Sequence, residues 1–246
     1  MATEQEKSTL DTQAPSSIAS NKSQKSYTYY HAGPLFTIAD LHTNVILSTA
    51  ISQHSASKFI PILPQNLEQR GHVTPQNIRD KDIRALLSCD LALFTYDGAE
   101  LDSGTVVEFM IAKMADIPSV ILRSDFRGGG DQKDAGEGAG QPWNLMSSFW
   151  PRTGAVVVDA MMGYKQAVAA GAGVKAGEVL IEETARECVA AMEEALKQPA
   201  RMPKELRESV YRWIALMPGY AEGEDGKDVS ETLSLLAAKE EKGLFK

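Results

Sequence analysis

Residues 91–122 read LALFTYDGAELDSGTVVEFMIAKMADIPSVIL, and this stretch decides the fold. It opens with an apolar run at residues 91–94, continues with a helical pattern over residues 105–115, and ends with a second apolar run at 119–122. Short apolar runs that alternate with helices are typical of a parallel sheet covered on both faces. The stretch therefore predicts a strand, a helix and a second, parallel strand.

The same alternation extends in both directions along the chain. Strands are expected at residues 27–32, 59–63 and 155–158, and helices at residues 39–55, 75–88, 178–197, 203–216 and, as a shorter element, 230–242. The pattern predicts an α/β protein with a doubly wound parallel sheet and a C-terminal helical extension.

Composition divides the chain into parts. Residues 1–26 are rich in Ser, Thr, Gln, Lys and Glu, and we expect a disordered tail because they offer little apolar surface to bury. Residues 27–165 make up the predicted α/β domain, and residues 175–246 a helical extension that packs on the sheet or on a second subunit. The Gly-rich, charged residues 126–141 predict a surface loop, either a lid or a plain insertion.

Charge and apolar content narrow the class of partner. The net charge of -8 and the pI near 5.1 argue against a nucleic-acid partner, because binding phosphates requires clustered Lys and Arg. No apolar run approaches the roughly 20 residues that span a bilayer, so no membrane partner is expected. Cys89 and Cys188 are the only cysteines, which favours a reducing, cytoplasmic location. A small molecule is the expected partner.

Neither a metal nor a cofactor is expected. The four histidines do not have the spacing of metal ligands: they are His31, His42, His54 and His72. The sequence also contains no cluster of cysteines. The phosphate loop of the Walker type and the Gly-x-Gly-x-x-Gly fingerprint are both absent from the sequence.

Glu108 is the most unusual charged residue of the chain. Val107 and Phe109 flank it, and Ala112 stands where a basic residue four positions on could pair with it. Burying such a carboxylate is costly, so Glu108 either serves a function or lies on an exposed stripe of its helix. In the first case, the helix dipole and free backbone N–H groups would help to keep it ionised.

Asp102 has two interpretations. An Asp before a helix is an ordinary N-cap. Glycosyl transfer, however, needs one carboxylate as nucleophile and a second acid group to protonate the leaving base, and Asp97 and Asp102 bracket the turn before Glu108. Asp90 precedes a strand and is expected to cap or anchor the helix before it. The charged residues of that helix predict a solvated face: Arg79, Asp80 and Asp82.

The end of the first strand offers two further candidates. Gly33 and Pro34 form a tight turn that lets the backbone approach a ligand, and Tyr30 can present its hydroxyl to a carboxylate at the sheet edge. Ligands of open parallel sheets bind at the carboxyl ends of the strands, where this turn lies.

Four segments, in this order, resemble the nucleoside 2-deoxyribosyltransferase family. They are residues 30–36 (YHAGPLF), 78–83 (IRDKDI) leading to 89–93 (CDLAL), 102–108 (DSGTVVE) and 142–146 (PWNLM). The resemblance covers about residues 27–160, and its Asp-x-Gly-x-x-x-Glu piece is the most specific. It implies a flavodoxin-like (Rossmann-like) sheet and a double displacement, in which a carboxylate attacks the anomeric carbon and a second base then attacks the glycosyl-enzyme.

The resemblance also assigns roles to residues. It makes Glu108 the nucleophile, Tyr30 the residue that orients it, and Asp90 and Asp102 the carboxylates that contact and protonate the base. Asn144 would hold the sugar in a neighbouring subunit's site, which implies a homo-oligomer. The remaining candidates for binding the nucleoside or nucleobase are Gly33, Phe36 and Asp97.

Two departures and two alternatives qualify these assignments. The family often has Gly where this chain has Met110, and the helices after Gly173 are not part of the minimal family domain.

A hydrolase of 2'-deoxynucleoside 5'-monophosphates is one alternative, but residues 32–36 offer no Ser or Arg to hold a phosphate. The other alternative is a nucleotide-sensing module without turnover, against which the joint presence of Glu108, Asp102 and Tyr30 argues.

Overall fold

The computed structural model describes residues 25–67, 74–127, 130–132, 140–217 and 227–246. The predicted tail at residues 1–26 lies outside these ranges except for its last two residues. Most of the predicted loop at residues 126–141 lies outside them as well.

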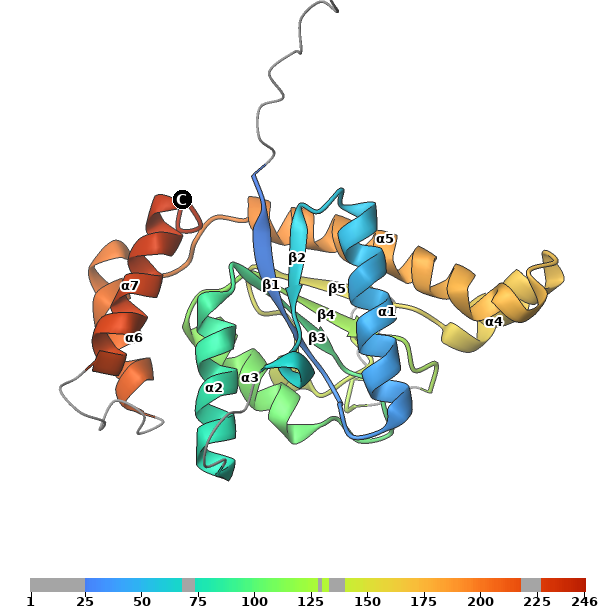
Figure 1. Ribbon diagram of the computed structural model, residues 1–246, viewed down its shortest axis with the longest axis horizontal. Helices are drawn as coiled ribbons and strands as arrows, with labels where there is room; N and C mark the ends of the chain where they lie inside the picture. The colour runs from blue at the N-terminus through green and yellow to red at the C-terminus, as the bar shows by residue number, and fades with distance from the viewer. Residues whose placement is uncertain (1–24, 68–73, 128–129, 133–139, 218–226) are drawn as a thin grey trace, which may run out of the picture.

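Five strands form one parallel sheet at the centre of the molecule (Figure 1). They are β1 (Tyr27–Ala32), β2 (Phe59–Ile62), β3 (Leu91–Thr95), β4 (Ser119–Arg123) and β5 (Thr153–Val157), in the spatial order β2-β1-β3-β4-β5. This is the strand order of flavodoxin-like folds. The predicted α/β class and the parallel sheet are therefore confirmed.

Helices cover both faces of the sheet. Helices α1 (Ile38–His54) and α5 (Ala176–Lys197) lie on one face, while α2 (Pro75–Ser88) and α3 (Ser103–Met114) lie on the other (Figure 1). Side chains alternate along each strand, so neighbours in β1 enter different cores. Tyr29 packs beneath α1 and α5, whereas Tyr30 packs on the side of α2 and α3.

The C-terminal half differs from the expectation in two respects. Helix α4 (Ala160–Ala169) was not predicted, and the expected domain boundary at residue 165 falls inside it. Helix α5 packs on the sheet, which is one of the two placements expected for the C-terminal extension, and its Cys188 and Met192 are part of the core beneath one face. Only α6 (Lys204–Leu216) and α7 (Lys227–Glu241) form an added pair, which packs on the side of α2 and α3.

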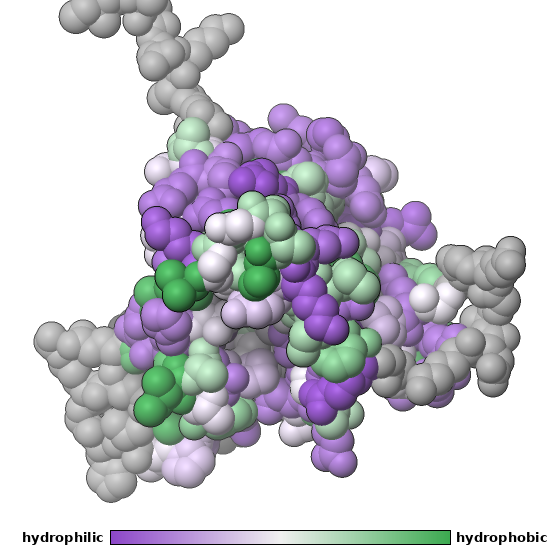
Figure 2. Space-filling view, turned by 90° about the vertical axis from the view of Figure 1, so that its right-hand side faces the viewer, coloured by the Kyte–Doolittle hydropathy of each residue, from purple (hydrophilic) through white to green (hydrophobic). Residues whose placement is uncertain are grey.

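The surface on the side that carries α4 is mainly hydrophilic, with separate hydrophobic patches (Figure 2). No helix in the described ranges has the length and apolar character that crossing a membrane requires. Both cysteines are buried and free.

Candidate active site

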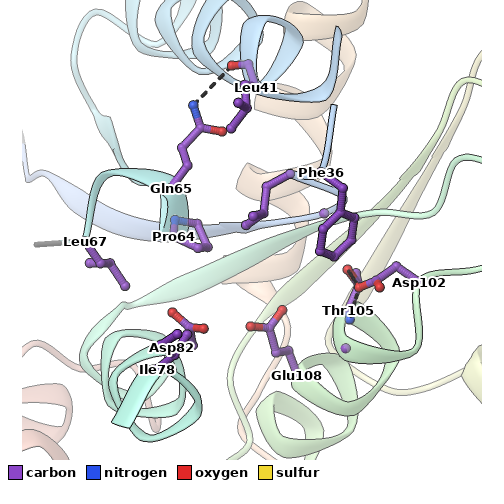
Figure 3. Close-up of a pocket in the computed structure, with 13 residues that line it drawn as sticks. Phe36, Leu41, Pro64, Gln65, Leu67, Ile78, Asp82, Asp102, Thr105 and Glu108 are labelled. Carbon is purple, nitrogen blue, oxygen red and sulfur yellow. Dashed lines mark hydrogen bonds between the residues drawn. The ribbon is translucent and has the colours of Figure 1, made fainter. Parts of the chain in front are cut away.

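A cavity of about 530 Å³ opens at the carboxyl edge of the sheet (Figure 3). The turn after β1, the short 3-10 helix η1 (Pro64–Asn66), and helices α2 and α3 converge around it. Its walls are apolar where Leu35, Leu41 and Ile78 lie, and three carboxylates reach it: Asp82, Asp102 and Glu108. This size and mixed lining are typical of small-molecule sites.

Glu108 lies in this cavity, half-buried, and is held by Tyr30. The Tyr30 hydroxyl donates a hydrogen bond of 2.7 Å to Glu108 Oε1. The contact follows from the fold, because the alternation along β1 turns Tyr30 towards α3. Glu108 therefore faces a cavity and does not belong to an exposed stripe.

Burial controls the protonation of this pair. It raises the pKa of Glu108 to about 7; the Tyr30 hydrogen bond opposes the rise, and the negative charges of Asp82 and Asp102 add to it. Burial and the adjacent Glu108 raise the pKa of Tyr30 far above its usual value, so this hydroxyl stays a donor. A carboxylate poised near neutrality in a cavity is a common feature of catalytic sites.

Asp102 fits both of its interpretations at once. It is the N-cap of α3, and its Oδ2 accepts hydrogen bonds from Thr105 N at 2.7 Å and from Thr105 Oγ1 at 2.8 Å. The same residue lines the cavity. Because the cap uses one carboxylate oxygen for both bonds, capping does not remove Asp102 from the chemistry of the cavity.

Asp82 is the cavity residue that the sequence interpretation missed. The sequence predicts a solvated face for Asp82, but from α2 its side chain points into the same space as Glu108 (Figure 3). Burial raises its pKa, against the effect of the neighbouring Lys81. The available signal was its position four residues after Ile78, since this spacing puts both side chains on one face of the helix.

Gly33 and Phe36 shape the entrance to the cavity. A Cβ atom on Gly33 would lie 2.9 Å from Thr95 Cβ, so only glycine lets this turn pass so close to β3. Phe36 lines the cavity with a side chain that is 74% exposed. An exposed aromatic ring at the mouth can cover a planar ligand.

Asp90 lies far from this cavity, at the start of β3 and thus at the amino edge of the sheet. Its Oδ2 accepts a hydrogen bond of 2.7 Å from Thr28 N and pairs with Lys242 Nζ at 2.5 Å. The predicted contact between Asp90 and a base does not fit this position. Its role is to anchor α7 and the following residues to the sheet.

Asp97 also turns away from the cavity. Its Oδ1 accepts hydrogen bonds from Ser124 N at 2.5 Å and Asp125 N at 3.0 Å, and its Oδ2 accepts one from Ser124 Oγ at 2.6 Å. These bonds occupy both carboxylate oxygens with the loop after β4. The predicted substrate contact of Asp97 therefore does not fit either.

Asn144 is not among the residues that line the cavity. It caps the 3-10 helix η2 (Leu145–Ser147), with Oδ1 accepting from Met146 N at 2.9 Å. Its contribution to a neighbouring subunit's site stays a prediction.

Within the described ranges, no group of three or more His, Cys, Asp or Glu side chains could hold a metal ion.

One family model matches the chain. The family model described as nucleoside 2-deoxyribosyltransferase matches residues 29–146, which include Tyr30, Asp82, Asp102 and Glu108. No curated protein matches the chain.

Solved structures include several similar chains. A conserved protein from Enterococcus faecalis V583 is 27% identical with a TM-score of 0.45, over 56% of this chain and 94% of that one. A 2-desoxiribosyltransferase from Leishmania mexicana is 22% identical with a TM-score of 0.40, over 59% of this chain and 99% of that one. An azoreductase from Bacillus anthracis str. Sterne is 12% identical with a TM-score of 0.36, over 68% and 99%.

Proposed function

Because residues 29–146 belong to the nucleoside 2-deoxyribosyltransferase family, we propose that this chain transfers a 2-deoxyribosyl group between nucleobases through a covalent intermediate on Glu108. The observation that carries the proposal is the hydrogen bond from Tyr30 to Glu108 inside a cavity that Asp82 and Asp102 also line. A nucleophilic carboxylate needs a fixed orientation, and Tyr30 supplies a donor for one oxygen while the other stays available for attack.

The reaction proceeds in two displacements at the anomeric carbon. In the first, a Glu108 oxygen forms a bond to C1' while the bond from C1' to the base nitrogen breaks, and an acid group gives the leaving base a proton. In the second, a new base attacks C1', loses a proton to the same acid group and releases Glu108. Two inversions leave the configuration at C1' unchanged.

Asp82 is the best candidate for this acid group. Burial raises the pKa of Asp82, which favours the protonated form that a proton donor needs. Asp102 accepts two hydrogen bonds from Thr105 with the same oxygen, Oδ2, so its Oδ1 is left to contact the ligand. Asp102 would therefore orient the base by accepting a hydrogen bond from it.

The charges of the cavity favour a neutral nucleoside over a nucleotide. Its described lining residues include three carboxylates and neither Lys nor Arg. A phosphate dianion would meet repulsion without a compensating cation. We therefore expect 2'-deoxynucleosides to react and their 5'-monophosphates to be poor substrates.

One incubation tests the activity: deoxyinosine with and without free adenine, followed by chromatography. Transfer gives deoxyadenosine and hypoxanthine only when adenine is present. Release of free deoxyribose with no new nucleoside would instead identify a hydrolase, in which water replaces the second base. No reaction with this or with pyrimidine donors would contradict both activities.

The covalent step has its own test. Glu108→Ala should reduce turnover by about 10³-fold or more, because the nucleophile is lost. Glu193→Ala is a matched control, since this partly exposed glutamate of α5 pairs with Lys58 away from the cavity. Turnover that survives in Glu108→Ala would rule out the mechanism.

A further inference from the structure

The last residue of β4, Arg123, is a buried arginine. Arg123 is only 2% exposed, and its Nη1 donates a hydrogen bond of 2.6 Å to the carbonyl of Tyr96. Its Nη2 reaches the carbonyl of Gly98 at 3.5 Å and that of Arg127 at 2.9 Å. Hydrogen bonds from a charged guanidinium are stronger than those between neutral groups. The Arg123 side chain therefore fixes the backbone at these three carbonyls.

Asp97 makes the reciprocal connection. Arg123 reaches from β4 to the loop after β3, and Asp97 reaches from that loop back to Ser124 and Asp125. Arg123 and Asp97 together form what we call the loop clasp. Each side chain binds the backbone of the other loop, so neither loop can shift without breaking bonds of both residues.

The clasp connects to the active site along two paths. The loop that it holds runs from Tyr96 through Gly98 to Asp102, which lines the cavity and caps α3. The Tyr96 ring also packs edge-on against Phe109, with centroids 6.1 Å apart, and Phe109 is the neighbour of Glu108. Arg123 itself is not among the residues that line the cavity.

We propose that Arg123 and Asp97 are positioning residues that set the place of Asp102, and with it the start of α3, for the reaction on Glu108. The inference rests on the proposed function. Positioning of this kind matters because a displacement of about 1 Å at a reacting group can cost on the order of 10²-fold in rate. The clasp thus gives Asp97 a role that differs from the substrate contact expected from the sequence.

The first test compares two arginines of the same loop. Arg123→Met removes the three hydrogen bonds that Arg123 contributes to the clasp. Arg127→Met removes a guanidinium that is largely exposed and pairs with Asp125. We expect kcat to fall by about 10- to 100-fold in Arg123→Met, with a smaller change in KM, and to stay within about twofold in Arg127→Met. Arg123→Lys keeps one donor and should recover part of the lost kcat.

A second pair separates hydrogen bonding from side-chain removal at Asp97. Asp97→Asn keeps an oxygen that can accept from Ser124 N and Asp125 N, whereas Asp97→Ala loses all three hydrogen bonds that Asp97 accepts. The Ala variant should lose kcat as Arg123→Met does, and the Asn variant should retain most of it. Equal losses in both would overturn the positioning role of these bonds.

A double-mutant cycle distinguishes positioning from a merely structural role. If Arg123 acts through Asp102, Arg123→Met should cost little further kcat once Asp102→Asn is in place, so the two losses will not add. Full additivity, or an Arg123→Met enzyme that is folded and as active as Arg127→Met, would overturn the proposal.

Hydrogen exchange gives a readout that needs no turnover. Amides of residues 96–105 should exchange about 10-fold faster in Arg123→Met than in Arg127→Met. If the wild-type chain transfers no deoxyribosyl group, the proposed function fails while this exchange result still reports on the clasp. Unchanged exchange would show that Arg123 does not hold the loop.

Discussion

At the scale of single residues, burial and the Tyr30 hydrogen bond have opposite effects on the protonation of Glu108. Burial drives Glu108 towards its neutral form, and the Tyr30 hydrogen bond favours the ionised form that attacks carbon. The net result is a pKa of about 7, close to neutral pH. The Tyr30 hydroxyl is therefore an activator of the nucleophile as well as its support.

The pH dependence of Tyr30→Phe tests this balance. The acidic limb of kcat/KM should follow Glu108, with activity rising through pH 7 as the carboxylate ionises. Removing the hydroxyl removes a bond to the ionised form, so the limb should move to higher pH by about one pH unit. The pH profile of kcat/KM is the measurement.

Tyr29→Phe is the matched control for that variant. Tyr29 is the preceding residue of β1, fully buried on the opposite face, and its hydroxyl has no hydrogen-bond partner among the described residues. The acidic limb should therefore stay in place. A limb that moves equally in both variants would show that Glu108 is not tuned by Tyr30.

Glu108→Gln should stabilise the protein. Glu108 has an ordinary pKa near 4.5 when unfolded and one of about 7 when folded, so the folded state holds its proton more tightly. Stability is consequently lost as pH rises from 4.5 through 7, and above 7 the loss is complete, at most about 3 kcal/mol. Glutamine cannot ionise and avoids this loss.

Urea unfolding at pH 5 and pH 8 would measure the effect. Glu108→Gln should exceed the wild type at pH 8 by about 1–3 kcal/mol and by much less near pH 5, where the wild-type side chain is mostly protonated when folded. A variant that is equally or less stable at pH 8 would mean that the Glu108 carboxylate is well solvated.

At the scale of elements, the N-cap residue of α3, Asp102, has two functions. Asp102→Asn should keep the cap, since asparagine is as good an N-cap as aspartate, but it removes the negative charge from the cavity. We expect kcat/KM to fall by about 10- to 100-fold with stability changed by less than about 0.5 kcal/mol.

Asp102→Ala removes the cap as well and provides the comparison. It should add a loss of about 1 kcal/mol in unfolding free energy, while its kcat/KM should be no higher than that of Asp102→Asn. Urea unfolding and initial-rate assays of both variants separate the two contributions. An Asn variant with wild-type kcat/KM would leave Asp102 as a cap alone.

The elements also show how far the sequence could predict this structure. All five strands were predicted to within two residues at each end. The apolar runs are clearest in β3 and β4, which are buried almost throughout, whereas β2 and β5 are partly exposed. Helix α4 was missed, since only Ala167 of it is buried and its apolar positions show no single face. Helix α5 was found but assigned to an extension, because the helical period does not reveal which sheet a helix covers.

The site residues also divide into those that local sequence patterns predict and those that depend on packing between elements. Glu108, Asp102, Gly33 and Phe36 lie in local patterns near strand ends, and all of them line the cavity. The surroundings of Asp82 and Asp97 depend on which neighbouring element approaches them, and the only local signal for Asp82 is its spacing of four residues from Ile78. Asp90 was assigned by resemblance to a binding role, although it sits at the wrong edge of the sheet.

At the scale of the whole molecule, the active site and the anchor of the C-terminal helices lie at opposite edges of the sheet. Arg152, just before β5, is 2% exposed; its Nη1 donates to Asp116 O at 2.6 Å and lies 3.1 Å from Asp116 Oδ1. Its Nη2 donates to Leu244 O at 2.7 Å. Asp116 in turn accepts bonds from the backbone N–H groups of Arg201 and Met202, just before α6. One buried ion pair thus fixes both ends of the α6–α7 pair.

Arg152→Met should therefore lower the stability of the protein without changing its activity. Removing one partner of a buried ion pair leaves the other charge uncompensated, so unfolding free energy should fall by about 3 kcal/mol in urea titrations. Because Asp116 and Leu244 lie away from the cavity, kcat and KM of the folded variant should stay within about twofold of the wild type. Arg212→Met, which breaks an exposed pair with Glu208 on α6, should change stability by less than about 0.5 kcal/mol. A large loss of kcat in folded Arg152→Met would mean that the C-terminal helices act on the site across the sheet, and that the two edges are not independent.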